Sequence, residues 1–181
     1  MQAGLEWIVA QYPLKLKGLD FDNGTEFLNW GLIAWADAKG LANITRSRPY
    51  QHNDNAHVEQ RNGDWVRKHA FRFRYTTDAE LAWLNELWEQ VCFKKNYILP
   101  CKKAVGWEKT SSGRSRRVYD KPATPYRRLL WSGALDDKTD ARLAGIDYSL
   151  NPAKITRRIN SIQQKLIGSA AQPTQVFAAA G

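Results

Sequence analysis

The sequence predicts an α/β chain with a short sheet of about two strands, flanking helices and a separate helical region towards the C-terminus. Three observations lead to this prediction. Residues 14–21 alternate between apolar and polar side chains, the period of two that is typical of a strand. Residues 26–39 and 78–96 carry apolar side chains at helical spacing, as expected of helices with one buried face. Residues 152–168 repeat that pattern with Ile155, Ile159, Ile162 and Leu166 on one stripe.

The N-terminal part predicts a strand–helix–strand unit. A short helix over 3–11 ends before Pro13, and Gly18 interrupts the strand that follows. The helix over 26–39 ends at Gly40, and a second short strand covers 41–46. Such a unit can return its two ends to the same edge of a sheet.

Two carboxylates enclose the helix and the second strand of this unit. Asp22 lies at the end of the first strand, and Glu59 lies in a helix expected over 54–69, with 36 residues between them. Carboxylates that meet at a sheet edge suit hard cations such as Mg²⁺ or Mn²⁺. By spacing alone, an exposed turn residue and a solvated helix residue explain the pair better, because most acidic side chains are exposed.

The residues around the two acids resemble a known family. The run Phe21-Asp22-Asn23-Gly24-Thr25-Glu26-Phe27, and the later run Asn53 to Asn62 after Arg48-Pro49-Tyr50, resemble motifs of the DDE recombinases, which include retroviral integrases and bacterial insertion-sequence transposases. The resemblance implies a partial ribonuclease-H-like core. It also implies that Asp22 is the second catalytic aspartate, that Glu59 is the third acid, and that both ligate a pair of Mg²⁺ or Mn²⁺ ions. The implied activity is DNA transposition or integration, by 3′-end cleavage and strand transfer.

The family's first aspartate has no match in this chain, because no Asp precedes Asp20. That aspartate belongs to the first strand of the fold, which we expect to precede residue 1. We therefore interpret the chain as an N-terminally truncated transposase that is not active alone. The alternatives are a catalytically inactive DNA-binding or regulatory remnant, and an unrelated basic nucleic-acid-binding module.

Positive charge is concentrated in one segment. Residues 94–128 hold eleven Lys or Arg against two acids, a net charge of +9 that equals the net charge of the whole chain. Concentrated positive charge favours a polyanion such as DNA, while a solubilising linker is the alternative interpretation. We expect DNA contacts from this segment and from the region around the acids, where the Tyr50 ring could equally pack on its own loop: Arg46, Arg48, Tyr50, Asn55, Arg61, Asn62, Arg67, Lys68, Lys102, Lys103, Arg114, Arg116 and Arg117.

The remaining features set the expected organisation. We predict a partial integrase catalytic core over 1–100, a basic linker over 101–123, a helical region over 124–168 and a disordered tail over 169–181. The partners expected are DNA (transposon ends and target) and either a second copy or full-length transposase. No stretch of 18 apolar residues and no secretory signal is present, so we expect no membrane association and a bacterial cytoplasmic, nucleoid-associated location. The apolar face expected on the 78–96 helix consists of Leu81, Leu84, Leu87, Trp88, Val91 and Cys92, with Cys92 as a core residue.

Overall fold

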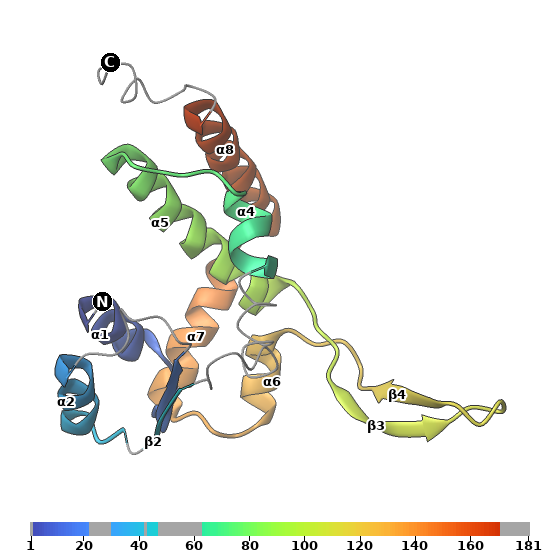
Figure 1. The fold of residues 1–181 in the computed structure, drawn as a ribbon. Helices are drawn as coiled ribbons and strands as arrows, with labels where there is room; N and C mark the ends of the chain where they lie inside the picture. The colour runs from blue at the N-terminus through green and yellow to red at the C-terminus, as the bar shows by residue number, and fades with distance from the viewer. Residues whose placement is uncertain (1, 22–29, 42, 47–62, 171–181) are drawn as a thin grey trace. The chain divides into compact units, whose positions relative to one another are not determined.

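The computed structural model describes residues 2–21, 30–41, 43–46 and 63–170. The chain is α/β, with helices and two small sheets (Figure 1). It divides into two compact units, Met1–Lys68 and His69–Gly181. The predicted boundary near residue 100 differs from this division, because the helix that begins at Asp78 packs with the C-terminal helices.

The first unit contains the predicted strand–helix–strand arrangement. Helix α1 (Gln2–Gln11) precedes strand β1 (Gly18–Phe21), and helix α2 (Trp30–Ala38) leads to strand β2 (Asn43–Arg46). The two strands pair in parallel, as a connection through a helix allows. The predicted elements are therefore present in the described residues, although both strands are shorter than expected.

Gly18 begins the pairing of the sheet. It lies opposite Asn43, and a Cβ atom at position 18 would lie 2.2 Å from the Asn43 carbonyl oxygen. Only glycine permits this approach without a shift of the backbone. The residue that interrupts the apolar alternation in the sequence is therefore needed where the two strands first meet.

One apolar cluster holds the first unit together. Leu32, Trp35 and Ala36 on α2 are buried together with Leu41. The side chains that pack against them come from α1, from the segment before β1 and from β1 itself: Leu5, Val9, Leu16, Leu19 and Phe21. Burial of this one face explains why α2 forms beside a sheet of only two strands.

The second unit is built on two long helices. The predicted 78–96 helix is observed as α5 (Asp78–Phe93), which continues into the π-helical turn η3 (Lys94–Ile98). It packs against α8 (Pro152–Ala170). The stripe expected on α8 is confirmed, because Ile155, Ile159, Ile162 and Leu166 are all buried.

The buried face of α5 differs from the expected one. Leu87 and Val91 are fully buried as predicted, but Leu81 and Cys92 are exposed. The inward stripe begins one residue earlier, at Glu80, because that carboxylate caps the helix and also meets α8. Cys92, expected in the core, therefore lies beside the interface rather than in it.

Glu80 is a buried charge with four hydrogen-bond partners. Its carboxylate accepts from the backbone N–H groups of Thr76 and Thr77 at 2.8 and 2.9 Å, from the Thr77 hydroxyl and from the Ser169 hydroxyl of α8. These bonds, that of Ser169 first, lower the pKa of Glu80 to about 2. The Glu80 carboxylate thus links the start of α5 to the end of α8.

Shorter helical elements complete the two units. A π-helical turn, η2 (Gly63–Arg67), at the end of the first unit runs into α4 (Lys68–Ala70). Helices α6 (Pro125–Trp131) and α7 (Asp137–Ser149) form the rest of the predicted helical region. Thr124 and Asp136 cap them through side-chain oxygens that accept from Arg127 and Thr139 N–H groups. The tail from residue 171 onward lies outside the described residues.

Candidate functional site

The sheet of the first unit has a defined carboxyl edge. The parallel register runs from Gly18 opposite Asn43 to Phe21 opposite Arg46, so both strands end at the same level. In parallel sheets this edge is where ligand sites commonly form. Asp22 directly follows Phe21 in the sequence, and the segment that leads to Glu59 starts after Arg46.

The two predicted acids themselves lie outside the described residues, as do Arg48, Tyr50, Asn55, Arg61 and Asn62. Their convergence therefore stays a prediction. Within the described residues no group of three His, Cys, Asp or Glu side chains could hold a metal ion.

Asp20 is the carboxylate of β1 that the structure does describe. It accepts a hydrogen bond from the Thr45 hydroxyl at 2.7 Å, across the pair of strands. This bond joins the two strands near the edge where Asp22 would begin. Asp20 therefore supports the sheet beside the predicted site.

The basic residues before the second unit are placed only in part. Arg46 is the last residue of β2. Arg67 and Lys68 are exposed, on η2 and α4, and the Lys68 ammonium lies 3.9 Å from the Asp64 carboxylate one turn earlier. Exposed pairs of this kind contribute little to stability, so both cations remain accessible to a phosphate.

The segment expected to be a basic linker over 101–123 is instead an antiparallel hairpin. Strand β3 (Ala104–Lys109) pairs with strand β4 (Ser115–Tyr119), without a third strand among the described residues (Figure 1). The Ser111-Ser112-Gly113 run that suggested a flexible break forms the turn. It is closed by the Thr110 N–H, which donates to the Arg114 carbonyl at 2.8 Å, and by Gly113 with a φ of 77°.

The hairpin is strongly basic and exposed. Residues 101–121 hold seven Lys or Arg against two acids, and the five predicted DNA contacts among them are all exposed: Lys102, Lys103, Arg114, Arg116 and Arg117. Both acids are engaged in ion pairs. Glu108 pairs with Arg116 across the strands, and Asp120 pairs with Arg128. Most of the positive charge therefore faces solvent without an acidic neighbour on the hairpin.

Arg128 of α6 holds the base of the hairpin. Its guanidinium donates to both carboxylate oxygens of Asp120, to the Cys101 carbonyl at 2.6 Å and to the Lys121 carbonyl at 3.3 Å. Asp120 in turn accepts from the Lys103 N–H at 2.7 Å. The Arg128 hydrogen bond lowers the pKa of Asp120 and raises that of Arg128 itself. Sequence reasoning missed this contact, because nothing in the spacing of Asp120 and Arg128 distinguishes it from other charges of the segment.

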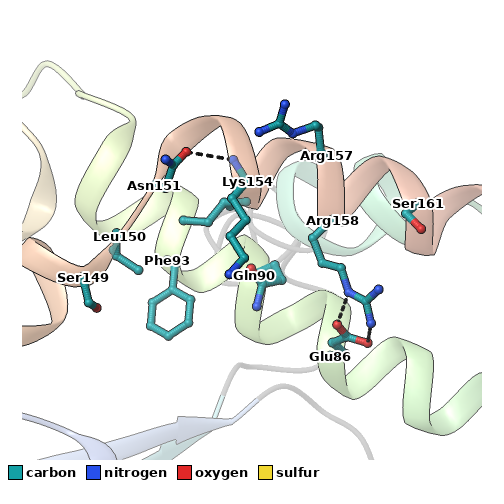
Figure 2. Close-up of a pocket in the computed structure, with 11 residues that line it drawn as sticks. Glu86, Gln90, Phe93, Ser149, Leu150, Asn151, Lys154, Arg157, Arg158 and Ser161 are labelled. Atoms are coloured by element: carbon teal, nitrogen blue, oxygen red, sulfur yellow. Dashed lines mark hydrogen bonds and ion pairs between the residues drawn. The ribbon is translucent and has the colours of Figure 1, made fainter.

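The second unit also contains a groove of about 550 Å³ between α5 and α8 (Figure 2). Arg158 lies on one wall and is paired with Glu86 of α5 through two hydrogen bonds, which lower the pKa of Glu86. At the start of α8, Asn151 accepts from the Lys154 N–H at 3.0 Å. The Glu86–Arg158 pair joins α5 to α8 across the groove, whereas the Asn151 contact caps the start of α8 itself. Both contacts are accounted for by helix packing and capping.

Comparison with known proteins finds one similar protein and no function. A protein of Sinorhizobium fredii (strain NBRC 101917 / NGR234) named "Uncharacterized protein y4rM" is 36% identical over 127 residues. The match covers 70% of this chain and 35% of that protein, so the chain spans about a third of the length of its relative. No protein family and no solved structure matches the chain. None of the described helices is both long and apolar enough to cross a membrane.

Proposed function

We propose that this chain is part of a DDE-type recombinase that acts on DNA by metal-dependent phosphoryl transfer. The observation that carries the proposal is the parallel pairing of β1 and β2 through α2, which ends with Phe21 opposite Arg46. Phe21 and Arg46 end the two strands at the same sheet edge. Asp22 directly follows the first of them in the sequence, and the segment that leads to Glu59 follows the second. The motif around each acid supplies the chemical identity, by resemblance.

The donor set suits the ions that the resemblance implies. Asp22 and Glu59 offer carboxylate oxygens, the ligands that Mg²⁺ and Mn²⁺ prefer. The two residues would hold the ions, which when bound activate an attacking hydroxyl and stabilise the leaving 3′ oxygen. Basic side chains of the chain would hold the DNA backbone beside them, since phosphate contacts fix the register of a protein on DNA.

Two acids are fewer than the family's three. We therefore expect this chain alone to bind DNA without cleaving it. A binding or regulatory remnant is the second candidate function, and the hairpin favours it, because its exposed basic residues are more than forty residues away in sequence from the nearer acid, Glu59. Such a remnant could join an intact recombinase and inhibit it.

A plasmid assay tests the proposal without knowledge of the element's ends. Nicking of supercoiled plasmid and strand transfer of a labelled duplex are followed in Mn²⁺. The chain is assayed alone and mixed with a polypeptide that carries the family's first strand and aspartate. We expect activity in the mixture only, and its loss in Asp22→Asn and Glu59→Gln. Activity of the mixture that persists in both variants would contradict the proposed roles.

The same assay separates the two candidate functions. The matched control is Asp20→Asn, which removes a neighbouring carboxylate that is engaged with Thr45 rather than assigned to the metal. It should retain activity in the mixture. If the mixture is inactive while the chain binds DNA and slows an intact recombinase, the regulatory function is favoured instead.

A further inference from the structure

We propose that the β3–β4 hairpin binds unpaired nucleotides through one face, formed by Trp107, Arg117 and Tyr119. The inference deepens the proposed function, because it names the form of nucleic acid that the chain recognises. It does not depend on the two acids, and it can therefore fail or hold separately from them.

The strand register places the three residues on one face. Trp107 lies directly opposite Arg117 in the antiparallel pair. Tyr119 follows Arg117 by two residues and so shares its face, since side chains alternate along a strand. Opposite Tyr119 lies Ala104, because a shift in register between Ala104 and Gly106 leaves Val105 as an extra residue.

The opposite face has a different character. There Glu108 lies opposite Arg116, and the two form an ion pair. Gly106 and Val118 lie opposite one another on the same side. This face offers no exposed aromatic ring, and its charges compensate one another. The hairpin is therefore two-sided. The aromatic rings and the cations Arg117 and Lys109 share one face, and the compensated Glu108–Arg116 pair lies on the other.

The aromatic rings are exposed to an extent that packing does not explain. Trp107 is 66% exposed and Tyr119 is 50% exposed. In a two-stranded sheet without a covering layer, burial of the rings contributes little, and the Arg117 contact covers only one side of the Trp107 ring. Large exposed rings flanked by charge instead mark a binding surface.

The charge of the hairpin selects a polyanion as the occupant. All seven Lys and Arg side chains of residues 101–121 are exposed, and the two acids of this segment, Glu108 and Asp120, are both paired. The Arg117 guanidinium carbon lies 5.1 Å from the centre of the Trp107 ring. This cation–π contact places a phosphate-binding group beside a ring on which a base can stack.

The rings favour unpaired bases over duplex DNA. In a duplex the faces of the bases are already stacked, so a ring can reach them only after the stack is opened. Lys and Arg side chains alone would suffice for a ribbon lying in the major groove, which reads base edges rather than faces. Single strands expose base faces, and loss of one stacking ring typically weakens their binding by roughly 5- to 100-fold.

Hydrogen bonds fix the base of the hairpin, where its two strands meet the rest of the second unit. Cys101 and Ala123 exchange backbone hydrogen bonds of 3.0 and 3.2 Å. Arg128 joins the same base to α6 through Asp120 and two carbonyl groups. Two strands tied at one end hold Trp107 opposite Arg117 and keep Tyr119 on the same face.

Fluorescence anisotropy tests this proposal on the full chain. The probes are a labelled thymidine oligonucleotide of about 16 nucleotides and a duplex of the same length, each in EDTA so that metal chemistry is excluded. We expect tighter binding of the single strand. Trp107→Ala should weaken single-strand binding by roughly 5- to 100-fold and duplex binding far less, while Trp107→Phe should recover much of the loss.

Matched charge variants identify the face. Arg117→Gln and Arg116→Gln each remove one cation from β4, but only Arg117 lies beside Trp107. We expect the first to weaken binding clearly more than the second. Equal effects, or a Trp107→Ala chain that binds the single strand as the wild type does, would overturn the proposal. Equal losses on both probes would identify a duplex-binding ribbon instead.

A last control separates this inference from the proposed function. Asp22→Asn and Glu59→Gln should bind the single strand as tightly as the wild type, because neither residue belongs to the hairpin. If the acid variants lose nicking in the mixture with the complementing polypeptide but keep single-strand binding, both proposals are supported. If the acid variants keep nicking in that mixture while Trp107→Ala loses single-strand binding, the hairpin proposal is supported and the role of the acids is contradicted.

Discussion

The salt dependence of DNA binding should report how many phosphates the hairpin neutralises. Six Lys or Arg side chains between Lys102 and Arg117 are exposed, and Arg116 is already paired with Glu108. About five phosphate contacts are therefore expected. For a single strand the slope of log Kobs against log salt is about −0.7 per contact, so a slope near −3.5 follows. Affinity should fall by about 100-fold between 50 and 200 mM salt.

Removal of three of these cations sharpens the test. The triple variant Lys102→Gln/Lys103→Gln/Arg114→Gln should reduce the magnitude of the slope by about 2. The control variant Lys39→Gln/Lys138→Gln/Arg142→Gln removes the same charge from exposed sites on other elements. It should leave the slope nearly unchanged. Titrations by anisotropy at four salt concentrations measure both. A slope that falls equally in the two variants would show that only net charge matters and would refute the localised interface.

Three further predictions concern the frame that presents this interface. Leu166→Ala should lower the free energy of unfolding by about 2–5 kcal/mol, because the Leu166 side chain on α8 is fully buried. Urea denaturation measures this loss, and Ile167→Ala, at the exposed neighbouring position, is the control. The pKa of Glu80 is lowered to about 2, so its stabilising contribution is complete above its usual pKa of 4.5 and is lost as the pH falls towards 2. Glu80→Gln should flatten this part of the pH profile of the melting temperature, whereas Glu89→Gln, exposed on the same helix, should not. Arg128→Leu should speed hydrogen exchange at the Lys103 and Asp120 amides without altering exchange in α5, and slow exchange at both amides would show that Arg128 does not hold the hairpin.

Periodicity predicted the elements whose burial is regular. The stripe from Ile155 to Leu166 repeats every three or four residues, and all of its named members are buried. The first strand was predicted from alternation over residues 14–21, and the return of the second strand to the same sheet edge was predicted from the strand–helix–strand order. One face of α8 is buried, and Leu19 and Phe21 of β1 are partly buried against the cluster on α2, so packing sets these patterns. Residues 43–45 of β2 are exposed, and its short apolar pattern carries less of this signal.

Sequence patterns did not predict the hairpin or the buried face of α5, because tertiary contacts decide the structure there. The 101–123 segment looks like a linker because its strands carry charge on both faces and bury neither, which removes the alternation that marks a strand. On α5, Leu81 is apolar yet exposed, while Glu80 is charged yet buried. Its four hydrogen bonds compensate the burial, and three of the partner groups are local but the Ser169 hydroxyl lies 89 residues away in the chain.

Only the strands and the helix that carry the candidate site could be predicted from the sequence and compared with the structure. The sheet edge next to Asp22 follows from the strand–helix–strand order, and the structure contains that order. The aromatic face of the hairpin was not predicted, because Trp107 and Tyr119 come together only through the register of the two strands. An alternation of aromatic and basic residues around a turn would have been the signal for it.

The convergence of Asp22 and Glu59 is the central claim, and a distance between them tests it most directly. Ions about 3.5–4 Å apart, each about 2 Å from its ligands, require the carboxylate oxygens to lie within about 8 Å. Spin labels are attached at Asp22→Cys and Glu59→Cys in a chain with Cys92 and Cys101 replaced by Ser. The account predicts strong dipolar broadening in the doubly labelled chain. A spectrum equal to the sum of the two singly labelled spectra would contradict it.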